Sequence, residues 1–137
     1  MNINRIEIRC LALAAVLSCG SLARADDIVM VMAPTATAVT KDQVANLYLG
    51  RSTGFTPLDL PESSPIRAVF YRKATDRDSA QVKSVWSRIV FTGQGKPPKE
   101  MPDAAAVKKA VAADSKAIGY IAKSDVDASV KIVLALP

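Results

Sequence analysis

Two serines and an arginine lie together at a predicted helix start, where they could bind an anion. Ser64 precedes a proline, and a hydroxyl at the N-cap followed by proline is a favoured helix beginning. Arg67 then occupies the third helical position, where a cation opposes the positive end of the helix unless an anion is near. One candidate anion is the carboxylate of Asp59 or Glu62, in a surface ion pair. The other is a bound oxyanion, held by the hydroxyls of Ser63 and Ser64, the free N–H groups of the first turn and the Arg67 guanidinium.

Residues for catalysis or metal binding are scarce. The chain has no His, and its two cysteines, Cys10 and Cys19, lie within the first 25 residues. Neither serine therefore has a histidine to activate it as a nucleophile. Two pairs of nearby carboxylates lack calcium-loop spacing and are interpreted as turn and cap residues: Asp76 with Asp78, and Asp125 with Asp127. The Gly93 to Lys96 segment lacks the spacing of a phosphate loop. We expect no enzyme, no metal site and no cofactor.

Residues 1–25 are predicted to be a secretory signal peptide. Two arginines precede an apolar run that is too short to span a membrane, and the small-residue site Ala23-Arg24-Ala25 follows it. This pattern predicts export to the periplasm with Asp26 as the first residue. As an alternative, V-L-S-C at residues 16–19 resembles the box before a lipid-modified cysteine, which would anchor the protein at Cys19.

Residues 26–137 are predicted to form one domain, because no repeat, linker or low-complexity tract divides them. The formal net charge of +5 is spread along the chain without a Lys/Arg block, and aromatic residues are few. The sequence therefore gives no support for nucleic-acid binding, although a small anion stays possible.

The predicted elements follow the order β, α, β, α, α, α, β, β, which indicates an α/β layer with helices covering a small sheet. A capping box with Thr40 and Gln43 opens the first helix. Trp86 lies on the apolar stripe of the third helix and is expected to be buried. Apolar runs at residues 28–33 and 130–136 both predict strands in the middle of a sheet. The remaining segments are strands at 57–60 and 117–121, helices beginning at Ser64, Asp78 and Asp103, and a loop over 94–102.

Three segments taken together resemble the substrate-binding proteins of phosphate ABC transporters. They are V-T-K-D-Q-V-A-N-L-Y-L-G at 39–50, P-E-S-S-P-I-R-A-V-F-Y at 61–71 and A-I-G-Y at 117–120. The resemblance covers nearly all of residues 26–137 but corresponds to one lobe of a protein that normally has two. It implies an α/β fold, namely a single lobe of the type 2 periplasmic-binding-protein kind, with a small mixed sheet covered by helices.

The same resemblance places Ser64 on the family's phosphate-binding serine. Pro65 and Ile66 stand where the family has glycine and threonine, and its arginine ahead of this loop has no counterpart, since Asp59 and Leu60 occupy that region. The resemblance implies a periplasmic protein that binds phosphate or a similar oxyanion through Ser63, Ser64 and Arg67, as a substrate-binding component related to phosphate ABC transport. The alternative is a non-catalytic interaction module that has kept the fold and lost the ligand. A single lobe that lacks its second half could also pair with an envelope protein or form a homodimer.

Overall fold

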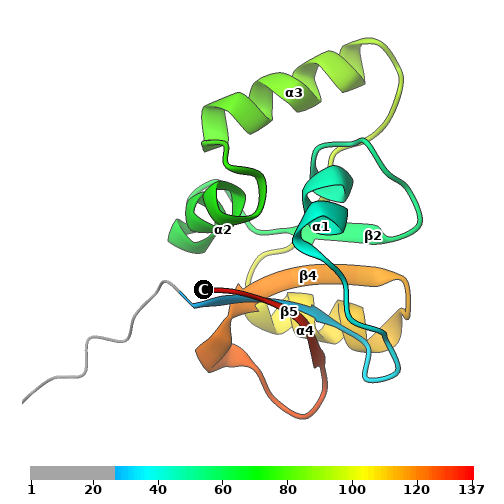
Figure 1. Ribbon diagram of the computed structural model, residues 1–137, viewed down its shortest axis with the longest axis vertical. Coiled ribbons are helices and arrows are strands. Elements are labelled where there is room, and N and C mark those ends of the chain that lie inside the picture. Colours follow the sequence, from blue (N-terminus) through cyan, green and yellow to red (C-terminus); the bar gives the residue numbers. More distant parts are fainter. Residues whose placement is uncertain (1–26) are drawn as a thin grey trace, which may run out of the picture.

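The computed structural model describes residues 27–137, so the predicted signal peptide, its cleavage after Ala25 and the lipid site at Cys19 lie outside the described residues. These residues form one α/β unit (Figure 1). Its strands are β1 Ile28–Met32, β2 Thr56–Asp59, β3 Lys99–Glu100, β4 Ala117–Ala122 and β5 Lys131–Leu136. Its helices are α1 Lys41–Tyr48, α2 Pro65–Thr75, α3 Ser79–Phe91 and α4 Ala104–Ala113, with a short 3-10 turn at Lys123–Asp125.

The five strands form one mixed sheet in the order β3-β2-β4-β1-β5. β1 is antiparallel to both of its neighbours, whereas β2 is parallel to β3 and β4. Helices cover both faces of the sheet. On β4, Gly119 faces α4, because an added Cβ there would lie 2.5 Å from Val107 Cγ1. The next residue, Tyr120, points to the opposite face and stacks on Phe70 of α2, with ring centroids 3.8 Å apart.

The helix starts and most of the predicted core are confirmed. Thr40 and Gln43 form the expected capping box, and Asp78 and Asp103 both cap their helices by accepting hydrogen bonds from backbone N–H groups. Gly50 follows α1 with a φ of +73°, a left-handed conformation that glycine adopts without strain. Trp86 is buried, as its place on the α3 stripe predicts, and its indole N–H donates to the Tyr48 carbonyl at 2.8 Å.

The prediction that residues 130–136 lie in the middle of the sheet is wrong, because β5 is an edge strand that pairs with β1. Its apolar composition has another cause. The segment before α1 runs along the outer side of β5, where the Val39 amide donates to the Val133 carbonyl at 3.1 Å and the Lys131 ammonium donates to the Ala36 carbonyl at 2.7 Å. A covered edge strand can be as apolar as a central one.

Two further details differ from the sequence prediction. The segment 94–102 is not entirely loop, because Lys99–Glu100 pairs with the end of β2 as a two-residue strand. On α2, Phe70 and Ala74 are buried as predicted, but Ile66 and Val69 are only half-buried, and Tyr71 and Thr75 are buried in addition. The buried face of α2 is thus rotated toward the polar residues described below. Within residues 27–137, no helix is long and apolar enough to cross a membrane.

Candidate functional site

The ends of β2 and β3 form a switch point in the topology of the sheet. These strands are parallel neighbours, and their last residues, Asp59 and Glu100, are paired in register. After β2 the chain enters α2, whereas after β3 it enters α4 on the opposite face. Where two neighbouring parallel strands feed opposite faces, their carboxyl ends leave a crevice that commonly binds ligands. The predicted anion-binding helix start lies directly after β2, and therefore beside this crevice.

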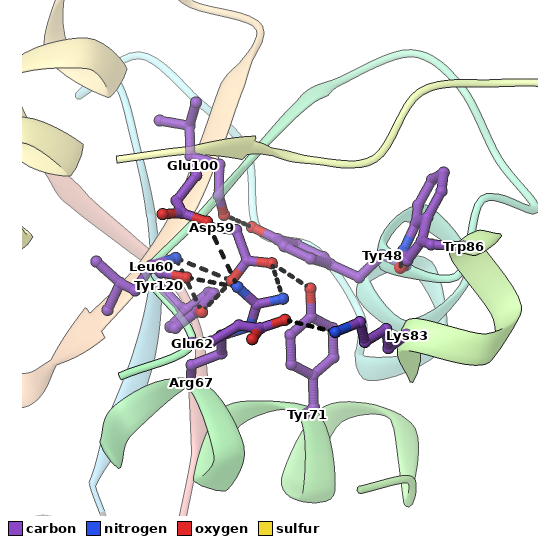
Figure 2. Close-up of polar contacts among 11 residues, drawn as sticks. Tyr48, Asp59, Leu60, Glu62, Arg67, Tyr71, Lys83, Trp86, Glu100 and Tyr120 are labelled. Carbon is purple, nitrogen blue, oxygen red and sulfur yellow. Dashed lines mark hydrogen bonds and ion pairs between the residues drawn. The ribbon is translucent and has the colours of Figure 1, made fainter. Parts of the chain in front are cut away.

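Asp59 is the polar centre of this region, although its residue is only 3% exposed (Figure 2). One carboxylate oxygen, Oδ2, accepts a hydrogen bond from the Tyr71 hydroxyl at 2.5 Å. The other, Oδ1, accepts from the Tyr120 hydroxyl and from the Leu60 amide, the latter at 2.9 Å. A buried carboxylate is costly unless such donors and a counter-charge surround it. This network therefore ties β2 to α2 and β4 through one side chain.

Three tyrosines pack around that carboxylate and keep their protons. Tyr48 donates its hydroxyl to the carbonyl of Leu58 at 2.7 Å, and its ring lies edge-on to Phe70, Tyr71 and Tyr120. Burial raises the pKa of all three tyrosine hydroxyls well above their usual value, and the negative charge of Asp59 raises them further. They therefore act as hydrogen-bond donors and not as bases.

Of the two carboxylates that the sequence offers as partners for Arg67, the structure pairs it with Asp59 and not with Glu62. Its Nη2 lies 3.7 Å from Asp59 Oδ2, while Nη1 donates to the Leu60 carbonyl at 2.9 Å and lies 3.9 Å from Glu100 Oε2. The pair is not the surface pair expected, because the Arg67 side chain is 18% exposed and that of Asp59 4%. Glu62 pairs instead with Lys83, at 3.8 Å. Among the described residues, Arg67 Nε is the buried side-chain polar atom that lacks a hydrogen-bond partner.

Ser64 is the N-cap of α2, as predicted, but its hydroxyl makes no capping hydrogen bond. The hydroxyl and the Ile66 amide, which belongs to the first helical turn and has no acceptor within the helix, are therefore open to an external acceptor. Ser63 is exposed and Ser64 is half-buried. The two serines thus lie at the helix start as expected, while the Arg67 guanidinium is directed toward the strand ends.

A cavity of about 580 Å³ lies between the strand ends and α3. Asp59, Arg67 and Tyr71 reach it from one side, and Ser63 and Ser64 are not among its lining residues. The opposite wall comes from α3 and the following loop. It is mainly apolar, with Lys83 and Ser87 among the apolar side chains: Val82, Trp86, Val90, Phe91, Pro97 and Pro98. Of the three residues proposed from sequence, the structure therefore brings only Arg67 into the cavity.

Sequence reasoning missed three residues of this network: Tyr71 and Tyr120, which donate to Asp59, and Glu100, which lies near Arg67. The sequence predicts Asp59 only as a surface partner for Arg67. One signal could have indicated its burial, because Asp59 interrupts the apolar P-L-D-L strand between two leucines that are both buried. The contacts of Tyr120 and Glu100 depend on strands paired across distant parts of the chain, for which the sequence has no local pattern. Within residues 27–137, no group of His, Cys, Asp and Glu side chains could hold a metal ion.

Comparison with known proteins identifies structures that share this fold. No family model and no curated protein matches the chain. An ABC-type phosphate transport receptor from Vibrio cholerae is 18% identical with a TM-score of 0.54, covering 77% of this chain and 44% of that one. A putative phosphate ABC transporter substrate-binding protein from Clostridium perfringens, solved with bound phosphate, is 19% identical with a TM-score of 0.61, covering 77% and 43% respectively.

The chain therefore spans less than half the length of either solved structure. Its five-stranded mixed sheet with helices on both faces is the fold of a single lobe of a periplasmic binding protein, which confirms the fold class predicted from the sequence.

Proposed function

We propose that this chain is an exported, non-enzymatic protein that binds phosphate or a similar oxyanion at the start of α2, in a role related to the substrate-binding component of phosphate transport. The observation that carries the proposal is the open first turn of α2, with an uncapped Ser64 hydroxyl at the sheet's switch point. The shared fold supports it, because one of the similar structures contains bound phosphate.

The surrounding charges limit the affinity that we expect. Arg67 already shares its charge with Asp59 and Glu100, and these carboxylates repel an incoming anion. An anion bound to this lobe alone would also remain open to water on its outer side. We therefore expect a dissociation constant on the order of 0.1 to 10 mM, which corresponds to about −3 to −5.5 kcal/mol.

Calorimetric titration of the exported protein with phosphate and with sulfate tests this proposal. Ser64→Ala should weaken binding, because it removes a hydroxyl from the open turn. Arg67→Lys should also weaken it, because lysine keeps the charge and loses the planar fork of donors. Arg72→Lys is the matched control, an exposed arginine in the last turn of the same helix.

Affinity should fall only modestly with added salt, since Arg67 is largely buried and salt screens partly buried charges less than exposed ones. Equal affinity in the wild type and both site variants would contradict the proposed site. Circular dichroism of each variant separates lost binding from lost folding.

Export to the periplasm is part of the same proposal, and it is tested by the intact mass of the secreted protein. A mass that begins at Asp26 would support cleavage after Ala25 and a periplasmic location. A mass that begins at Cys19 with an added lipid would support the membrane-anchored alternative instead.

A second candidate is a non-catalytic interaction module of the cell envelope. Two observations favour it: the charge of Arg67 is already balanced by Asp59, and Phe91 is 93% exposed at the edge of the cavity. An absence of phosphate and sulfate binding at about 20 mM, roughly twice the weakest affinity proposed above, would favour this candidate.

A further inference from the structure

Among the long helices in residues 27–137, α3 is the one least packed against the rest of the protein. Figure 1 shows it at one end of the molecule, beyond α1 and α2 and away from β5. Its inner face packs on α2, and Trp86 reaches the Tyr48 carbonyl at the end of α1. Its last turn is open to solvent, with Val90 52% and Phe91 93% exposed. Adjacent apolar side chains at this exposure commonly mark a surface that another molecule covers.

The same helix lines the cavity that lies next to these exposed side chains. Val82, Trp86 and Val90 contribute one wall, and Pro97 and Pro98 from the following loop contribute another part. At about 580 Å³, the cavity has room for an aromatic side chain. The α3 region therefore carries both an exposed aromatic side chain and a cavity with an apolar wall that could receive one.

The charges around the cavity are also suited to a basic helix. Carboxylates outnumber cations among its lining residues, with Asp59, Glu62 and Glu100 against Arg67 and Lys83. Glu62 and Glu100 retain 66% and 60% side-chain exposure. The exposed surface of α3 carries no carboxylate. Of its two basic residues, Lys83 already lines the cavity and pairs with Glu62, so Arg88 is the one that adds a further positive charge. An α3 helix laid across the mouth of this cavity would bring opposite charges together.

We propose that two copies of this chain associate through α3, with Phe91 of each copy entering the cavity of the other. A two-fold symmetric contact uses the same surface on both subunits, so that surface must supply both complementary parts, here Phe91 and the cavity beside it. This inference goes beyond the anion-binding proposal and does not depend on it.

An antiparallel α3 pair that crosses at Ser87 satisfies these requirements. Ser87 lines the cavity and is exposed, and its small side chain allows the helix axes to approach within about 8 to 10 Å. With Ser87 on the two-fold axis, Phe91 of one copy lies opposite Lys83 of the other, because both are four residues from the axis. The ring of Phe91 then meets the ammonium of Lys83 at the cavity edge, a favourable cation–π pairing.

The first test is sedimentation equilibrium of the exported protein without phosphate, from about 10 μM to about 1 mM, the range of weak self-association. Wild type should show a concentration-dependent dimer. Phe91→Glu should raise the dimer dissociation constant by at least about 30-fold, because it removes a central aromatic anchor and places a carboxylate near Glu62. Phe55→Glu is the matched control, an exposed phenylalanine outside α3 that should leave the equilibrium unchanged.

The second test uses the absence of cysteine from residues 27–137. A Ser87→Cys variant should form a disulfide-linked dimer under mild oxidation, since the two thiols meet at the axis. Ser115→Cys, at an exposed turn far along the chain, should cross-link at least about tenfold more slowly. A wild type that is monomeric at 1 mM, a dimer that survives Phe91→Glu, or equal cross-linking of both cysteine variants would overturn the proposal.

Discussion

Replacing Asp59 by asparagine should destabilise the fold more than any other isosteric change at the site. The carboxylate accepts hydrogen bonds from Tyr71, Tyr120 and the Leu60 amide, and it is the buried partner of Arg67. Asparagine keeps the shape but has a single acceptor oxygen and no charge, so at least one hydroxyl loses its acceptor. Loss of a hydrogen bond to a charged group costs about 1.5 to 3 kcal/mol, and removal of one member of a buried ion pair costs about 3 to 5 kcal/mol. These contributions overlap, so we expect a total of about 3 to 5 kcal/mol.

Urea unfolding followed by the fluorescence of Trp86, the single tryptophan, measures this change. With a denaturant slope of about 2 kcal/mol per M, the unfolding midpoint should fall by about 1.5 to 2.5 M. Tyr71→Phe, which removes one donor and leaves the charge, should cost about 1.5 to 3 kcal/mol. Asp42→Asn is the control at an exposed carboxylate in the first turn of α1 and should cost at most about 0.5 kcal/mol.

A stability of Asp59→Asn within about 0.5 kcal/mol of wild type would refute this reasoning. It would mean that water or the asparagine amide satisfies these hydrogen-bond donors as well as the carboxylate does. It would also mean that Asp59 does not hold Arg67 in place. The direction of the Arg67 guanidinium toward the strand ends would then lose its physical explanation.

Three further predictions concern other parts of the fold. Trp86→Ala should destabilise by about 3 to 5 kcal/mol in urea unfolding followed by circular dichroism, because it empties a buried site and frees the Tyr48 carbonyl. In the folded protein, absorbance at 295 nm should show no tyrosinate near pH 10, whereas the tyrosines of the urea-unfolded chain should ionise there. Because folding raises the pKa values of these tyrosines, the free energy of unfolding should fall as pH rises above about 10. Hydrogen bonds from Ser129 and, to a smaller extent, from Lys108 lower the pKa of Asp127 to about 2, so the NMR signal of its carboxyl group should titrate there. The contribution of Asp127 to stability should be lost as pH falls from about 4 toward 2. Ser129→Ala should return the pKa of Asp127 toward its usual value.

Local sequence patterns were sufficient for the helices and for most strands. Capping boxes, the Ser-Pro helix start and the Gly50 stop depend on neighbours within a few residues, which the sequence displays directly. The α3 stripe, with its period of 3.6 residues, likewise located Trp86 in the core.

The order of the strands in the sheet could not be predicted from local patterns, because it depends on pairings between distant segments. An apolar composition could not show that β5 lies at an edge covered by the 33–39 segment. Nor could it show the pairing of Asp59 with Glu100, which brings a second carboxylate beside Arg67. The helix start with its serines was thus predictable, whereas the buried network that directs Arg67 away from them was not.

The most direct test of the proposed anion site is its location on the folded protein. In amide NMR spectra of the exported protein, phosphate should shift the signals of residues 63–67 saturably, with half-saturation between about 0.1 and 10 mM. The Ile66 amide in the first turn should move most, and Ser64→Ala should reduce the shifts. Unchanged spectra at about 20 mM phosphate, or shifts confined to other parts of the surface, would contradict the proposal that this helix start binds oxyanions.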